Sequence, residues 1–133
     1  MKTTNLDIVN EFLKAISDGK SGNELKRFYD EDVIQIEFPN LLTGKIVERN
    51  LDDILEASVR GKQVISNQNY EIIKSYVIDD NVIIEAVWTG ILAIPVEKLA
   101  AGDEMKAYFS QIFEFKNGKI LKQRNYDCFE NFM

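Results

Sequence analysis

The chain of 133 residues contains no histidine, and this absence removes several kinds of chemistry at once. Histidine is the commonest general base and metal ligand, and it completes the Ser–His and Cys–His dyads. Carboxylates alone could still hold a metal, but no EF-hand spacing or other ligand motif occurs, and neither does a glycine-rich phosphate loop. We therefore expect no metal and no cofactor.

Cysteine, basic clusters and long apolar runs are scarce as well. Cys128 is the only cysteine, which excludes an internal disulfide and fits a reducing compartment. The 22 acidic residues outnumber the 16 basic ones, which argues against a general nucleic-acid binder. No apolar run is long enough for a signal peptide or a membrane span. We expect a cytoplasmic protein that binds neither nucleic acid nor membrane.

The residues that are present suit a folded globular protein. Apolar residues make up 45% of the chain and charged residues 29%. The length suits one domain over residues 1–133. The first half predicts, in order, a helix capped by Thr4 or Asn5 and ended by Asp18-Gly19, a short helix over 24–29, a strand over 33–38, and a helix from Leu51 to about Gly61 capped by Asn50.

The second half alternates between apolar and polar residues, as strands do. The predicted strands cover residues 70–77, 82–92, 105–115 and 120–127. Residues 93–103 are expected to form a long loop or a single helical turn. This order predicts an α+β fold in which helices pack against one face of a mainly antiparallel sheet.

The turn Asn117-Gly118 decides which side chains of the last strand face inward. A two-residue loop would place Gln111 opposite Arg124 and bring cationic side chains inside. A three-residue loop, 116–118, would place Gln111 opposite Gln123 and leave those cations in water. Because an unpaired buried charge is costly, we predict the three-residue loop.

The alternation of the strands also predicts an internal pocket. On the first strand Ile34, Ile36 and Phe38 are placed inward, with Gln35 and Glu37 outward. The expected apolar wall consists of Phe12, Ile36, Phe38, Trp88, Phe109 and Phe113. The last strand is expected to turn Leu121, Gln123, Asn125 and Asp127 inward, which with Gln111 makes a polar strip. Such a strip is typical of a small-molecule site, and equally of a hydrogen-bonded core network.

Three segments resemble the nuclear transport factor 2-like superfamily, and in particular its SnoaL-like polyketide cyclase and ketosteroid isomerase-related branch. They are IVNEFLKAI, DEDVIQIEFP and FEFKNGKILKQRNYD, and their order and spacing cover nearly the whole chain. The resemblance implies a cone-shaped, strongly curved sheet packed on about three N-terminal helices around a pocket. It also implies a homodimer through the outer sheet face, where Arg124 and Tyr126 are expected. It implies fold more firmly than function.

Carrying the family's catalytic residues over excludes one mechanism and leaves another open. Where ketosteroid isomerases have a base and two oxyanion-holding groups, this chain has Phe38, Phe12 and Gln111, so that mechanism is not expected. SnoaL-like cyclases have an acid/base aspartate near the end of the last strand, and Asp127 matches it. Burial would raise the pKa of Asp127 towards the range useful for proton transfer, and Asn125 or Gln111 would hold the substrate oxygen.

Three functions remain open at this point. The chain could bind a small, largely apolar molecule without catalysis, with Gln111 and Gln123 among its contacts. It could be an acid/base enzyme on a carbonyl-bearing substrate that uses Asp127. It could be an assembly module whose cavity is filled by side chains. A buried Asp127 beside an open cavity, free of Lys122 and Arg124, would favour the enzyme.

Overall fold

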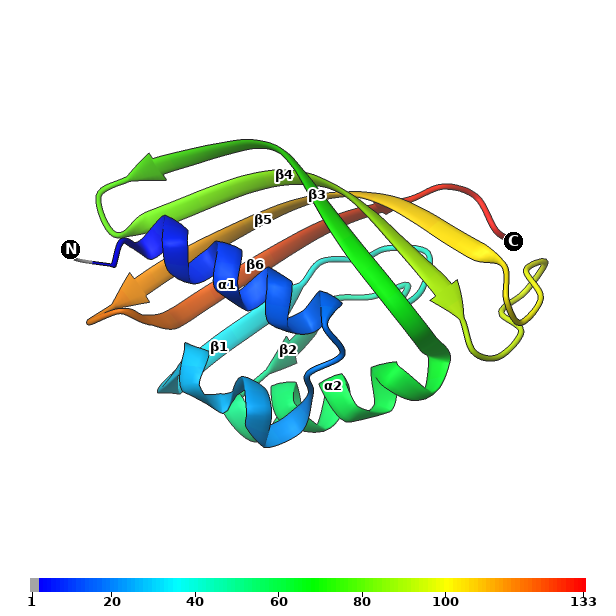
Figure 1. Ribbon diagram of the computed structural model, residues 1–133, viewed down its shortest axis with the longest axis horizontal. Helices are drawn as coiled ribbons and strands as arrows, with labels where there is room; N and C mark the ends of the chain where they lie inside the picture. The colour runs from blue at the N-terminus through cyan, green and yellow to red at the C-terminus, as the bar shows by residue number, and fades with distance from the viewer. Residues whose placement is uncertain (1–2) are drawn as a thin grey trace.

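The computed structural model describes residues 3–133. In it, helices cover one side of a curved six-stranded sheet (Figure 1). The elements are α1 (Asn5–Ser17), the 3-10 helix η1 (Gly22–Phe28), β1 (Tyr29–Glu37), β2 (Val47–Arg49), α2 (Leu51–Val64), β3 (Ile65–Ile78), β4 (Asn81–Leu92), β5 (Glu104–Lys116) and β6 (Lys119–Phe129). The α+β prediction is confirmed. Sequence reasoning missed β2 and began β3 five residues late, at 70 instead of 65.

The two long helices begin where their capping residues predict. Thr4 and Asp7 bond each other's backbone amides at the start of α1, at 3.0 and 3.1 Å. Asn50 and Asp53 form the same reciprocal box at the start of α2. A capping box satisfies amide groups that the first turn leaves without partners. The helices are thereby held in place to bury their apolar faces against the sheet.

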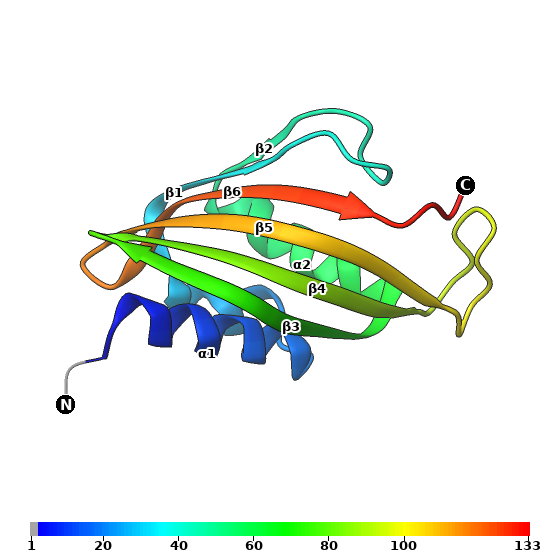
Figure 2. The same ribbon diagram turned by 90° about the horizontal axis from the view of Figure 1, so that it is seen from above.

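The sheet is mixed and open, with strand order β2-β1-β6-β5-β4-β3. Figure 2 shows the strands side by side from one edge to the other. β1 pairs in parallel with β6, and the other pairs are antiparallel. Irregular pairing near Asn67 and Lys74 accompanies the bend of β3 over α1. This arrangement agrees with the predicted cone-shaped sheet on three helices.

The hairpin between β5 and β6 differs from its prediction. Lys116 pairs with Lys119, so the loop contains only Asn117 and Gly118. Both loop residues have positive φ, 51° and 75°, as a type I′ turn requires. The predicted three-residue loop is therefore wrong.

A bulge just beyond this turn restores the predicted face of β6. The register shifts between Glu114 and Phe115, so that Gln111 lies opposite Asn125 instead of Gln123. The shift moves β6 by one residue, which turns its polar residues inward and keeps the cations outside. At the turn end, however, Ile120 is fully buried where Leu121 was expected.

Residues 93–103 form a loop without a helical turn. Its backbone is tied to the C-terminal segment by the Lys98 amide, which donates to the Phe132 carbonyl at 3.0 Å. Within residues 3–133, no helix has the length and apolar character needed to cross a membrane.

Candidate functional site

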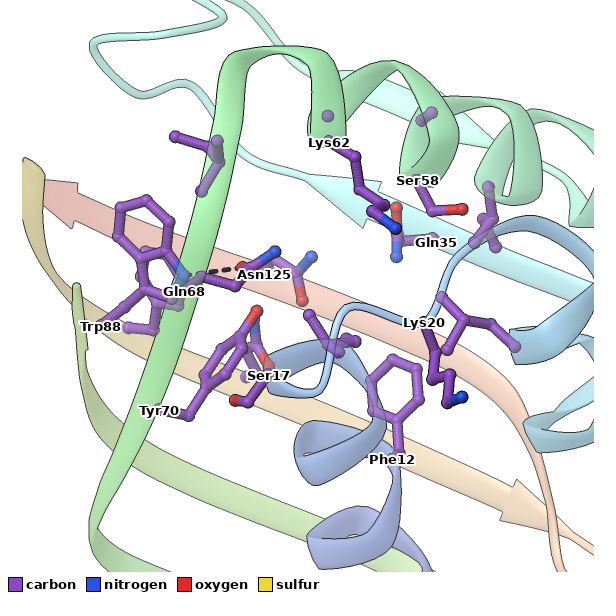
Figure 3. A pocket seen from close by; sticks show the side chains of 18 of the residues that line it. Phe12, Ser17, Lys20, Gln35, Ser58, Lys62, Gln68, Tyr70, Trp88 and Asn125 are labelled. Atoms are coloured by element: carbon purple, nitrogen blue, oxygen red, sulfur yellow. Dashed lines mark hydrogen bonds between the residues drawn. The ribbon is translucent and has the colours of Figure 1, made fainter. Parts of the chain in front are cut away.

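A cavity of about 400 Å³ lies between the sheet and the helices. Its volume falls within the usual range for small-molecule sites. The lining comes from α1, α2, η1 and all six strands, with Phe12 at one end of the apolar wall and Trp88 at another (Figure 3). None of residues 93–103 contributes to it.

The predicted polar strip lines this cavity. Gln111, Gln123 and Asn125 are buried polar side chains, each at most 8% exposed. Asp127 lies beside them on β6. Alternation along β5 and β6 brings all four to one face of the sheet, because side chains two residues apart point the same way. The structure thus gathers these four predicted residues in one place.

Of the five aromatic residues predicted for the apolar wall, three line the cavity and two, Phe113 and Phe38, do not. Trp88 stacks on Phe109 with ring centroids 5.5 Å apart, and its Nε1 donates to Gln68 Oε1 at 2.9 Å (Figure 3). Phe12 also lines the cavity. Phe113 does not, because it is fully buried in the core with its ring edge-on to Phe12.

The predicted face of β1 is wrong. Gln35 and Glu37 line the cavity, whereas Ile36 does not. Phe38 stacks on Tyr126 at 4.5 Å, on the face of β6 that points away from the cavity. The apolar alternation of this strand predicts the opposite face. Polar residues face the cavity because Arg49 and the Gln123 amide supply them with hydrogen-bond partners.

Asp127 is a mostly buried carboxyl group with an unsatisfied oxygen. Its Oδ1 is buried, and no side chain or backbone group of residues 3–133 donates to it. Burial, with a smaller contribution from the Glu37 carboxylate, raises the pKa of Asp127 to about 7. Arg124 forms its ion pair with Glu114, and no described cation pairs with Asp127. The geometry matches the pattern expected for a proton-transfer residue.

Sequence reasoning missed several polar residues around the cavity. Tyr70 on β3 is one, and burial together with the nearby Asp127 and Glu37 carboxylates raises the pKa of its phenol. In the full strand β3, which begins at Ile65, Gln68, Tyr70 and Ile72 alternate on the half-buried face, and this pattern is the signal that places Tyr70 inside. Arg49 is another. It lies on β2, whose three residues are too few to show an alternation of apolar and polar side chains.

Nothing in the described range gathers the side chains that a metal needs. No three acidic or cysteine residues among 3–133 lie close enough to hold an ion. Glu37 has both oxygens engaged, one by Arg49 and the other by Asn40, each at 2.9 Å. Among the carboxyl groups that line the site, Asp127 is therefore the one with a buried oxygen that has no partner in the described part of the chain.

No protein-family model matches the chain, and no curated protein sequence does so at the significance required. Solved structures do. A SnoaL-like polyketide cyclase of Agrobacterium tumefaciens strain C58 is 16% identical, with a TM-score of 0.72 over 96% of this chain and 92% of that one. A phenazine biosynthesis-related protein of Pseudomonas aeruginosa is 19% identical, with a TM-score of 0.69 over 92% and 74%.

A third structure, from Catenulispora acidiphila, has a ketosteroid isomerase-like fold and was solved in complex with trimethylamine. It is 21% identical, with a TM-score of 0.69 over 90% of this chain and 84% of that one. These likenesses define the chain's fold as the nuclear transport factor 2-like cone found in SnoaL-like cyclases. At such low identities they show the fold alone.

Proposed function

We propose that the chain is an acid–base enzyme that moves a proton on a small carbonyl-bearing molecule held in the cavity. The observation that supports this most strongly is the buried Asp127 oxygen, which has no partner in the described part of the chain. Leaving a buried acceptor without a donor costs about 1–3 kcal/mol, so a site that keeps one invites an explanation in function.

The chemistry needs one carboxylate that both accepts and returns a proton. Asp127 would remove a proton from the carbon next to the carbonyl, and the C–H electrons would move onto the carbonyl oxygen. The Asn125 amide would hold that oxygen, and Asp127 would then return the proton to the molecule. A base with a pKa of about 7 suits this exchange near neutral pH.

The shape and lining of the cavity support a ligand with an apolar body and a polar edge. Trp88 and Phe109 offer flat apolar surface, while Gln111, Gln123 and Asn125 offer hydrogen bonds. One fold neighbour was solved in complex with a small molecule, trimethylamine, which agrees with a ligand-binding role for this fold.

Exchange of the methyl protons of acetophenone in D2O, followed by proton NMR, tests the proposal. Asp127→Asn should slow the exchange by at least about 100-fold, as expected for losing a general base. The wild-type rate should rise with pH up to about 7 and then level off, because the deprotonated carboxyl is the base. Asp32→Asn, an exposed carboxylate on β1, is the control. Equal rates in wild type and Asp127→Asn would rule the base out.

Binding without catalysis is a second candidate, because the cavity and its buried amides would hold a small molecule without any proton transfer. Phe12, Phe38 and Gln111 stand where ketosteroid isomerases have catalytic groups, so that mechanism has no residues here. The third candidate, an assembly module with a filled interior, has less support, because an open cavity adjoins Asp127.

We further propose a homodimer through the outer sheet face, where Tyr108 and Tyr126 are exposed.

A further inference from the structure

Four polar side chains on three neighbouring strands form one chain of hydrogen bonds along the cavity wall. Arg49 on β2 donates from Nη1 to Gln35 Oε1 on β1 at 3.3 Å. Gln35 Nε2 donates to Gln123 Oε1 on β6 at 3.3 Å. Gln123 Nε2 then donates to Asn125 Oδ1 at 3.0 Å. The strand register brings the chain together, since Gln35 lies opposite both Arg49 and Gln123.

Arg49 fixes which group donates and which accepts at each hydrogen bond of this series. A guanidinium only donates hydrogen bonds and stays charged at any pH the protein meets. Gln35 must therefore accept through its oxygen, which leaves its nitrogen to donate to the next amide. The same holds for Gln123, so Asn125 accepts through Oδ1 and keeps Nδ2 as a donor. No acceptor among residues 3–133 bonds that nitrogen, and Asn125 lines the cavity.

Arg49 is itself held in place on the cavity side of the sheet. Its Nη1 also donates to Glu37 Oε1 at 2.9 Å, and the two side chains are 19% and 17% exposed. Asn40 Nδ2 donates to the other Glu37 oxygen at 2.9 Å. An ion pair this far from solvent keeps its geometry better than a surface pair does. Arg49 is therefore a fixed starting point for the amide chain.

We propose that Arg49 is a positioning residue that makes Asn125 a donor to the cavity, so that the site selects molecules placing a carbonyl or enolate oxygen there. The inference rests on the proposed function for the reaction that follows, but the selection itself needs no turnover. An amide without a fixed neighbour can present either its oxygen or its nitrogen. With Arg49 present, only the nitrogen faces the ligand.

Binding of two probes of the same shape tests this selection. Acetophenone carries a carbonyl oxygen, and α-methylstyrene has a CH2 group in its place. Trp88 is the only tryptophan and lines the cavity, so its fluorescence reports both. Arg49→Met should lower the acetophenone affinity, relative to that of α-methylstyrene, by about 10-fold, the usual worth of one hydrogen bond. Arg49→Lys, which also only donates, should retain the wild-type ratio.

A double-mutant cycle separates this role from a general structural one. In an Asn125→Ala background, Arg49→Met should leave the affinity ratio unchanged, because Arg49 acts through Asn125. Equal losses for both probes, or losses that add in the double variant, would overturn the proposal. Absence of saturable acetophenone quenching in wild type would do the same.

An NMR measurement on the wild type guards against variants that fail to fold. Acetophenone should shift the side-chain amide protons of Asn125, and an unmoved Asn125 signal would sink the inference. The experiments also separate this inference from the proposed enzyme activity. If only the enzyme proposal is wrong, proton exchange will not depend on Asp127, while the two probes will still bind with the expected affinity ratio.

Discussion

Two side-chain oxygens in the cavity wall, Gln111 Oε1 and Asp127 Oδ1, are buried without a hydrogen-bond donor from residues 3–133. Such groups are uncommon in native interiors, and each lowers the free energy of unfolding by about 1–3 kcal/mol. Both line one cavity instead of being scattered through the core. Functional sites typically contain groups that lower the free energy of unfolding, and interactions elsewhere in the protein offset this loss.

The raised pKa of Asp127 predicts how stability changes with pH. The unfolded carboxyl ionises near its usual value of 3.8 and the folded one near 7, so the folded state resists ionisation. The wild type should therefore lose stability as the pH rises through this window. Asp127→Asn removes the effect, and its free energy of unfolding should exceed that of wild type by a margin that grows with pH, up to about 4 kcal/mol.

Chemical denaturation at about pH 4 and about pH 8 measures this margin, which is complete once both states have titrated. Asp32→Asn provides a comparison at an exposed carboxylate. A margin that is the same at both pH values would show that Asp127 ionises at an ordinary pKa in the folded protein.

At the scale of an element, β4 shows how one strand shapes the cavity. Gly90 lies two residues after Trp88 on the same face of the strand. A Cβ atom at Gly90 would come within 2.6 Å of the Trp88 ring and 3.2 Å of Ile65. The missing side chain therefore leaves the space in which the indole lies flat on Phe109 and bonds Gln68.

Gly90→Ala should displace Trp88 and change the cavity. The contact cannot be relieved unless the ring moves, so we expect a loss of about 1–3 kcal/mol in the free energy of unfolding, as in other overpacked cores. The Trp88 emission should shift, and acetophenone binding should weaken.

Gly61→Ala on α2 is the matched control, since nothing lies within 4 Å of its new Cβ. It should stabilise the helix by about 0.5–1 kcal/mol. Unchanged fluorescence and stability in Gly90→Ala would mean that Trp88 does not depend on this space.

At the scale of the whole molecule, the sheet has two unlike faces. Helices cover the inner face (Figure 1), where the cavity lies, while the outer face carries exposed aromatic side chains. Tyr126 stacks on Phe38 and stays 41% exposed, and Tyr108 on the neighbouring strand is 47% exposed. Exposed aromatic residues on the outer surface of a sheet suit contact with a second copy of the chain.

Analytical ultracentrifugation tests the proposed homodimer. Wild type should sediment as a dimer, and Tyr126→Glu should shift it towards the monomer by at least about 10-fold in dissociation constant, since an unpaired charge would be buried. Val59→Glu, on an exposed part of helix α2, should leave the dimer intact. A wild-type chain that is monomeric at every concentration would refute the outer-face interface.

Much of the fold and part of the site follow from local rules that the sequence states directly. Capping residues and apolar spacing located α1 and α2, and alternation placed Gln111, Gln123, Asn125 and Asp127 on one face. These predictions succeeded because helix caps and strand alternation depend on neighbours a few residues away. The absence of histidine likewise limits the chemistry by composition alone, because no fold can supply a side chain that the chain lacks.

Only the tertiary structure decided the rest. Alternation shows that the faces of β1 differ, but not which of them is covered. The parallel pairing with β6 and the hydrogen bonds of Arg49 turned Gln35 and Glu37 inward and left Ile36 and Phe38 outside. A bulge offset the two-residue hairpin loop, and long-range packing put Tyr70 beside Asp127. Each outcome depends on partners far away in the chain, where buried polar groups find their hydrogen bonds.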